Sequence, residues 1–124
     1  VRTAQLIQEA GGDLLDVSTG MGSYTNVPPS FAFDGKLYAA SLVKQKSDLP
    51  VIGVGNIFTG EQAEQALEKG LADMIAVGRG HLADPAWAGK VLSGENPVPC
   101  RRCRRCLWYV DGRKCPAARE RRER

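Results

Sequence analysis

Three features are scarce or absent in this sequence. The first 99 of the 124 residues contain no cysteine, histidine occurs only at position 81, and no run of 18 apolar residues exists. Without such a run we expect no membrane-spanning helix, and no signal-peptide pattern is visible. The four cysteines are confined to residues 100–115, which favours a metal site over a disulfide framework. We expect a cytoplasmic protein, because thiols stay reduced in that compartment.

The formal net charge of +3 hides two segments of opposite sign. Residues 1–99 carry seven Lys or Arg and eleven Asp or Glu, which gives −4, whereas residues 100–124 carry ten and three, which gives +7. A basic tail of this kind is typical of a solvated linker or of a segment that contacts nucleic-acid phosphates. For residues 119–124 we favour the linker.

Residues 50–85 predict one β-α-β unit. The apolar runs 51–54 and 74–77 each end in glycine, and a helical pattern over residues 59–67 lies between them. Thr59 and Gln62 have the spacing of a capping box, which marks the start of that helix. Runs this apolar are typical of parallel strands that are buried on both faces of a sheet.

Other segments predict a further strand over residues 13–18 and helices over residues 1–10 and 37–46. A last helix is expected to begin with Asp84 as N-cap and Pro85 at its first position. Its inward face would carry Trp87, Ala88, Val91 and Leu92.

Residues 21–36 show no periodicity and are expected to form a loop, and loops of this length are often functional. Its aromatic side chains would either cover a flat ligand or, as we favour, pack the loop onto the fold. They are Tyr24, Phe31 and Phe33.

The glycines after the two central strands suggest a phosphate site. Gly55-Asn56 follows the first strand and Gly78-Arg79 follows the second. Glycine lets backbone N–H groups approach a phosphate closely, and β/α barrels usually bind phosphate in the loops after strands seven and eight. The alternative is that the glycines only form tight turns and that Arg79 pairs with an acid such as Asp84.

The segments VIGVGNI (51–57) and GLADMIAVGRGHLADP (70–85) resemble the NADH:flavin oxidoreductases related to old yellow enzyme. The resemblance implies an α/β fold in which residues 1–96 form the C-terminal portion of an FMN-binding (β/α)8 TIM barrel, about strands six to eight. It implies that FMN contacts Gly55, Asn56, Gly78, Arg79 and Ser18, with the backbone at Arg79 on the phosphate and its side chain near the isoalloxazine. The family's proton donor and substrate-anchoring pair lie on earlier strands, so we expect no catalytic residue here, and His81 matches none of them.

The chain is too short for a complete barrel of about 250 residues, although 124 residues suit one ordinary domain. It begins with Val1 rather than Met and enters a helical pattern at once. We therefore interpret it as a fragment or as one piece of a split protein, and we expect no turnover from these residues alone.

The segment CRRCRRC places Cys100, Cys103 and Cys106 within seven residues, and Cys115-Pro116 follows. Three thiolates on a tight loop with a remote Cys-Pro are typical of a [4Fe–4S] site, whereas zinc sites more often use two separated C-x2-C pairs. Zinc and free cysteines stay open as alternatives.

Within the flavin family, dienoyl-CoA reductase and trimethylamine dehydrogenase carry a cysteine cluster directly after the barrel. The resemblance therefore implies an iron-sulfur segment at residues 97–118, close to that branch of the family. The usual pattern there has three residues between the second and third cysteines and a longer gap to the fourth. This chain departs from it, with two residues and eight.

Together these inferences predict part of an FMN- and [4Fe–4S]-dependent oxidoreductase. The resemblance implies a small-molecule substrate, either an activated C=C bond that is reduced or an amine that is oxidised, with NAD(P)H or another electron carrier. It also implies two regions outside this sequence: the N-terminal half of the barrel and a downstream FAD- or NAD(P)-binding domain. The alternative is a zinc-binding α/β domain whose basic tail binds nucleic acid, and the identity of the metal would separate the two.

Overall fold

The computed structural model describes residues 1–20, 22 and 24–123. The chain divides into two compact units. The sheet unit consists of residues 1–57 and 63–76, and the tail unit consists of residues 58–62 and 77–124. Within the described residues, every helix is too short or too polar to cross a bilayer.

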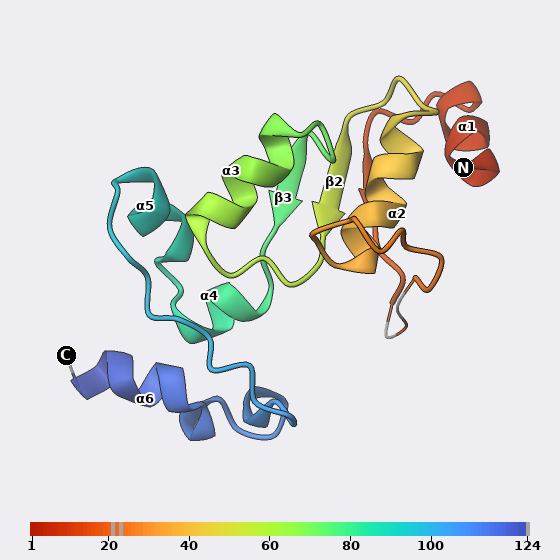
Figure 1. The fold of residues 1–124 in the computed structure, drawn as a ribbon. Helices are drawn as coiled ribbons and strands as arrows, with labels where there is room; N and C mark the ends of the chain where they lie inside the picture. The colour runs from red at the N-terminus through yellow and green to blue at the C-terminus, as the bar shows by residue number, and fades with distance from the viewer. Residues whose placement is uncertain (21, 23, 124) are drawn as a thin grey trace. The chain divides into compact units, whose positions relative to one another are not determined.

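A parallel three-stranded sheet forms the centre of the sheet unit (Figure 1). Its strands β1 (Leu15–Val17), β2 (Val51–Val54) and β3 (Met74–Ala76) lie in the order β1-β2-β3. Leu15 pairs with Val51, and Ile52 pairs with Met74. The predicted parallel β-α-β unit is confirmed, although β1 and β3 are shorter than the apolar runs that predicted them.

Helix α2 (Gly35–Lys44) covers the sheet through an unusually close contact at Gly53. A Cβ atom at Gly53 would lie 2.6 Å from the Leu37 Cδ1 atom and 3.0 Å from the Ala72 Cβ atom. Only glycine therefore allows β2 to approach its neighbours this closely. The helix begins two residues earlier than predicted because the Asp34 side chain accepts a hydrogen bond from the backbone N–H of Lys36, at 2.9 Å, and caps it.

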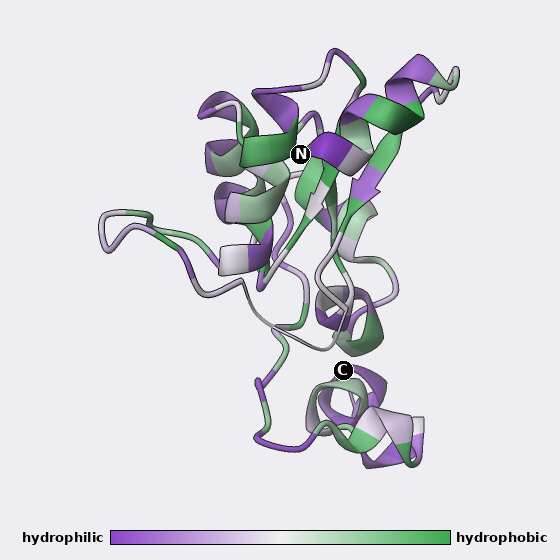
Figure 2. Cartoon of the chain, turned by 90° about the vertical axis from the view of Figure 1, so that its right-hand side faces the viewer, coloured by the Kyte–Doolittle hydropathy of each residue, from purple (hydrophilic) through white to green (hydrophobic). Residues whose placement is uncertain are grey.

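Two more helices complete the sheet unit, α1 (Arg2–Glu9) and most of α3 (Gly60–Glu68). The predicted capping box of α3 is confirmed: the N–H of Gln62 donates to Thr59 Oγ1 at 3.1 Å, and the Gln62 side chain accepts from the N–H of Thr59 at 3.3 Å. Ala66 is fully buried. Figure 2 shows the resulting pattern, with strands that are mainly hydrophobic and helices that carry polar residues.

The tail unit contains short helices and turns. These are α4 (Arg79–Ala83), α5 (Trp87–Leu92), η1 (Leu107–Tyr109), η2 (Gly112–Lys114) and α6 (Pro116–Glu123). Its small core consists of Ala83, Val98 and Ala117, against which Cys100 and Cys115 pack.

Several sequence predictions for the tail unit are wrong in detail. Helix α5 begins at Trp87 rather than directly after Asp84, and with six residues it buries only Trp87. Ala88 is exposed, and Leu92 is 87% exposed rather than inward-facing. The sequence predicted neither α4, which has five residues, nor α6, whose buried stripe is only Ala117 and Ala118.

Candidate functional site

The carboxyl edge of the sheet carries three of the predicted flavin contacts. Val17 pairs with Gly53 in register, so Ser18, directly after β1, lies at the same edge as Gly55 and Asn56 after β2. The Ser18 side chain is exposed, and its Oγ atom lies 3.5 Å from the N–H of Gly20, a long hydrogen bond. The structure thus brings these three residues to the edge of a parallel sheet where ligands commonly bind.

The turn at Gly55-Asn56 has a local cause that the sequence analysis missed. Gly55 has φ +148° and Asn56 has φ +50°, and the first of these values is accessible essentially to glycine alone. A Cβ atom on Gly55 would lie 3.0 Å from the Asp34 side chain. The Asn56 side-chain amide donates to Asp34 Oδ2 at 2.6 Å. Asp34 therefore stabilises this turn. The sequence signal for this role is the Asp34-Gly35 pair just before a helix, because aspartate is a preferred N-cap residue.

Gly78 and Arg79 belong to the tail unit, where Gly78 immediately precedes α4. A Cβ atom on Gly78 would meet nothing within 4 Å, and its φ of −86° is accessible to any residue. At Gly80, in contrast, a Cβ atom would lie 2.6 Å from Val77 Cγ1 and 3.2 Å from the Trp87 ring. Packing therefore explains Gly80 but leaves Gly78 with open space beside its backbone.

The predicted phosphate cradle takes residues from both units, so it stays a prediction. Of its two glycines, Gly55 is explained by its own backbone and by Asp34, whereas Gly78 is not explained by any neighbour. A phosphate oxygen that approaches the backbone at residue 78 fits this open space. The predicted FMN contact would therefore rest on Gly78 and on Arg79, the next residue.

The Arg79 guanidinium lies over an aromatic ring. Its Cζ atom is 5.1 Å from the centre of the Phe58 ring, and the Cζ atom of Arg102 is 5.4 Å from the same centre. Both distances are within the range of cation–π attraction. The Phe58 backbone is itself fixed, because its N–H donates to Gln62 Oε1 at 2.9 Å and its C=O accepts from Trp87 Nε1 at 3.1 Å.

Asp84, the proposed partner of Arg79, instead pairs with Lys90 at 2.7 Å. Its carboxylate is only 1% exposed and also accepts from the N–H of Val98 at 2.9 Å and from the N–H of Ala86 at 3.1 Å. Burial raises the pKa of Asp84, but these hydrogen bonds together lower the pKa further, so the net pKa lies below its ordinary value. A buried, ionised Asp84 therefore anchors the backbone just before the cysteine segment.

His81 lies in α4, and its ring centre is 5.8 Å from that of Trp87. The imidazole therefore packs against the indole. The aromatic loop residues also contact rings of the fold: Phe31 lies edge-on to Tyr38 of α2 at 5.0 Å, and Tyr24 lies 5.9 Å from Tyr38. These contacts are those that the favoured packing interpretation predicts.

The four cysteines of the tail unit are reduced thiols in different environments. Cys100 and Cys115 are half-buried against the same core, Cys106 is half-buried, and Cys103 is exposed. Among residues 1–20, 22 and 24–123, no three or more His, Cys, Asp or Glu side chains are arranged to hold a metal. As the side chains lie, the thiols do not converge on one point, and the Trp108 ring packs on Gly112.

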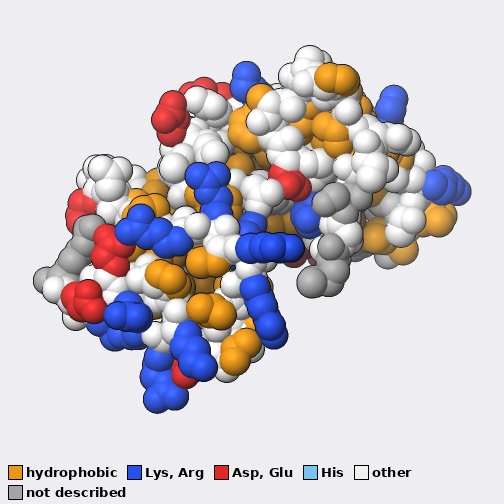
Figure 3. Space-filling view, turned by 60° about the horizontal axis from the view of Figure 1, so that its bottom comes forward, with side chains coloured by type: hydrophobic (Ala, Val, Ile, Leu, Met, Phe, Trp, Pro, Cys, Tyr) orange, Lys and Arg blue, Asp and Glu red, His pale blue; other side chains and the backbone are white. Residues whose placement is uncertain are grey.

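The tail unit also carries much of the positive charge of the chain. Figure 3 shows Lys and Arg side chains interspersed with hydrophobic ones on the face that contains this unit. Arg101 pairs with Glu120, and Arg113 pairs with Asp111 at 3.0 Å. Part of the basic charge is thus balanced by acids of the same unit.

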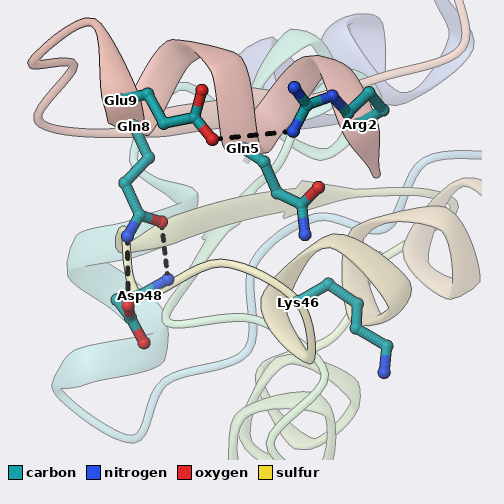
Figure 4. Close-up of a pocket in the computed structure, with 6 residues that line it drawn as sticks. All are labelled: Arg2, Gln5, Gln8, Glu9, Lys46 and Asp48. Atoms are coloured by element: carbon teal, nitrogen blue, oxygen red, sulfur yellow. Dashed lines mark hydrogen bonds and ion pairs between the residues drawn. The ribbon is translucent and has the colours of Figure 1, made fainter.

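A polar pocket of about 270 Å³ lies in the sheet unit, beside α1 (Figure 4). Its lining comes from α1 and from the turn before β2, at the amino ends of the strands: Arg2, Gln5, Gln8, Glu9, Lys46 and Asp48. The Gln8 amide donates to Asp48 Oδ2 at 3.0 Å and accepts from the N–H of Asp48 at 2.9 Å. A lining this polar does not suit a flat, largely apolar ring system, and the pocket lies at the opposite edge from Ser18 and Gly55.

Comparison with known proteins gives a consistent result. Residues 2–97 match the sequence model of the NADH:flavin oxidoreductase / NADH oxidase family. The chain is 39% identical over 117 residues to an NADH oxidase of Thermoanaerobacter brockii, and the alignment covers 89% of this chain and 17% of that protein. It is 30% identical over 117 residues to a bilirubin reductase of Mediterraneibacter gnavus, which covers 90% and 18%. The chain thus spans about a sixth of the length of these relatives.

A solved structure supports the fold. The chain resembles 6-hydroxypseudooxynicotine amine oxidase of Pseudomonas geniculata N1 with a TM-score of 0.56, at 22% identity, over 75% of this chain and 14% of that chain. The parallel sheet and the intervening helices fit a portion of a TIM-barrel-type fold.

The extent of these alignments bears on the cysteine segment. A continuous alignment that covers 89% of 124 residues must include residues 15–110, and so Cys100, Cys103 and Cys106. The alignment with the NADPH dehydrogenase of Bacillus subtilis, at 35% identity, covers only 77% of the chain and 29% of that protein. The similarity to the NADH oxidase therefore continues beyond the segment that matches the family.

Proposed function

Because this chain belongs to the NADH:flavin oxidoreductase / NADH oxidase family, we propose that it forms part of the FMN site of an oxidoreductase barrel. Its relatives are named NADH oxidase and NADPH dehydrogenase, and family membership implies flavin chemistry. The observation that carries the proposal is the open space beside Gly78, the residue that precedes Arg79. Bound FMN would supply hydride transfer, which the protein side chains cannot perform themselves.

The residues of this chain would bind and tune the flavin rather than react with substrate. Gly78 would let a phosphate oxygen approach the backbone, since a side chain there would occupy the same space. The positive charge of Arg79 would stabilise the anionic form of the reduced flavin. Ser18, Gly55 and Asn56 would line the edge of the sheet that faces the ligand.

For the complete protein we propose reduction of an activated C=C bond, with oxidation of an amine as the second candidate. The first is supported by relatives named bilirubin reductase and NADH:acrylate oxidoreductase. The chain is 48% identical to the latter, from Vibrio harveyi, over 60 residues, and that alignment covers 48% of this chain and 6% of that protein. The relatives extend far beyond this segment, which supports further domains for the cofactor and the electron donor.

The flavin proposal is tested by Gly78→Ala in the complete protein. Because the added methyl group meets no protein atom within 4 Å and φ is ordinary, the fold should be unaffected. Bound FMN, however, should be lost or bound at least about tenfold more weakly, since a clash of about 1.4 kcal/mol already has that effect. Gly89→Ala is the matched control, because that position is equally open. Equal flavin affinity in both variants would refute the proposed contact.

We further propose that the four cysteines ligate a [4Fe–4S] cluster. The support is their C-x2-C-x2-C-x8-C-P spacing, together with the continuation of the NADH oxidase alignment through the first three. Because the thiols do not converge as they lie, the loop would have to close around the metal. Anaerobic purification followed by metal analysis should find about four irons per chain. One zinc per chain and no iron would instead favour a zinc site with the same ligands.

A further inference from the structure

Two arginines of the tail unit share one aromatic ring, and only one of them belongs to the segment proposed to contact the flavin. Arg79 follows β3, whereas Arg102 lies between Cys100 and Cys103. Their Cζ atoms lie 5.1 Å and 5.4 Å from the centre of the Phe58 ring. The two charges are therefore separated by no more than about the Debye length at 0.1 M salt, 10 Å. The two guanidinium groups therefore repel each other electrostatically.

The ring that joins them is a fixed platform. The N–H of Phe58 donates to Gln62, at the start of α3, and its C=O accepts from the indole of Trp87 in α5. Phe58 is half-buried, so the ring is held by its neighbours on one part of its surface and open to cations on the rest. A movement of Arg102 would consequently change the electrostatic repulsion on Arg79 without displacing the backbone between them.

The backbone of Arg102 is also unusual. Its φ of +50° lies in the left-handed region, which a residue with a long side chain adopts only when its surroundings require it. In this conformation its guanidinium lies over the Phe58 ring. The strained position thus aims an arginine of the cysteine loop at the ring that also holds Arg79.

We infer that Arg102 is a positioning residue for Arg79 that acts through the ring of Phe58. Repulsion between two cations on the same ring limits the positions open to Arg79 and adds positive potential where its charge acts. The inference rests on the proposed function, since the group that responds is the FMN beside Arg79. It connects the cysteine segment to the flavin in the arrangement that the structure describes.

The test uses the complete flavin-loaded protein and measures the reduction potential of the flavin by spectroscopic titration. Arg102→Asn removes the guanidinium while keeping a residue that tolerates the left-handed backbone. It should lower the ratio of reduced to oxidised flavin at a fixed potential about threefold, because Arg79 is then held less firmly where its charge stabilises the anionic reduced flavin. Arg102→Lys, which keeps the charge, should retain most of that ratio. Arg104→Asn, at an exposed arginine of the same loop, should leave the ratio unchanged.

A double substitution separates this role from a general effect of charge. In a Phe58→Leu background, Arg102→Asn should have a clearly smaller effect, because the ring that relays it is gone. Flavin occupancy and thermal stability of the Arg102 variants should match those of the unsubstituted protein. An unchanged ratio in Arg102→Asn with flavin bound, or an equal loss in Arg104→Asn, would refute the positioning role while leaving the flavin site intact. Absence of flavin from the unsubstituted protein would refute both the proposed function and this inference.

Discussion

Replacement of Asp84 by Asn should release the segment that leads into the cysteines. The Asp84 carboxylate receives three hydrogen bonds, from Lys90 at 2.7 Å, from Val98 at 2.9 Å and from Ala86 at 3.1 Å, and is 1% exposed. Asparagine has nearly the same shape, but one oxygen becomes an amide that donates rather than accepts. At least one buried donor then loses its acceptor, and Lys90 loses its counter-ion.

The magnitude follows from the burial of the two partners. Loss of one partner of a fully buried pair costs about 3–5 kcal/mol, but Lys90 is 29% exposed and can turn to water, so we expect about 2–4 kcal/mol. The amide of Val98 is the direct reporter, because it donates to Asp84. Hydrogen exchange in the complete protein should accelerate at that amide by about 30- to 1000-fold, since each 1.4 kcal/mol is tenfold.

Asp73→Asn is the matched control. Asp73 also accepts from a lysine, Lys44 at 2.6 Å, and from a backbone N–H, that of Val51 at 2.9 Å, but its side chain is 38% exposed. The loss should therefore be no more than about 1 kcal/mol. Unchanged exchange at Val98 in Asp84→Asn, or equal effects of the two substitutions, would refute the argument from burial.

The same carboxylate sets a pH dependence. Because the net pKa of folded Asp84 lies below its ordinary value, its stabilisation is fully present above about pH 4, the range of an unfolded aspartate. It is lost as the pH falls through the lower pKa of the folded state. Exchange at Val98 should therefore accelerate in acid in the unsubstituted protein, and this additional acceleration should be absent in Asp84→Asn.

Three further substitutions test the packing. Gly53→Ala should destabilise the sheet unit by about 1–3 kcal/mol in chemical denaturation, because the new methyl group would lie 2.6 Å from Leu37 Cδ1. Trp87→Phe should cost about 1–3 kcal/mol, since the Phe58 carbonyl loses the indole donor at 3.1 Å, and retention of full stability would argue against that bond. Leu92→Gln should change stability by less than about 0.5 kcal/mol, because that side chain is 87% exposed; a larger loss would show that Leu92 packs after all.

The sequence predicted the elements whose signals are local and strong. Apolar runs between glycines predicted the parallel strands, and the spacing of Thr59 and Gln62 predicted the capping box, because both depend on neighbouring residues alone. The start of α2 was misplaced because the capping role of Asp34 was overlooked. The inward placement of Leu92 failed because a helix of six residues has too few turns to impose its periodicity on burial.

The functional residues could be predicted only where the chain itself brings them together. The glycines after β2 and β3 were predicted from the strand pattern, but the structural reasons for them differ. A side chain at Gly55 would collide with Asp34, whereas a Cβ atom at Gly78 would meet no protein atom within 4 Å. No sequence signal predicts that Phe58, Arg79 and Arg102 meet. Successive members of this set are about 20 residues apart in the sequence, and their contact is purely tertiary. Asp84 was correctly singled out, yet as a helix cap and a partner of Arg79 rather than as the anchor of Val98.

The cysteine segment is held to the rest of the tail unit at several independent points, and these explain how a loop with four closely spaced arginines is kept in place. Asp84 binds the backbone at Val98, the Phe58 ring binds Arg102, and Arg121 of α6 donates to the Ala83 carbonyl at 3.4 Å. All of these partners belong to α4, to its flanks or to the residues just before α3. Because Arg79 is the first residue of α4, whatever moves or orders the cysteines must act on the element that carries the proposed flavin contact. Ordering of the loop by a metal and binding of flavin at Gly78 and Arg79 should therefore be coupled, so that each changes the affinity for the other by the same factor.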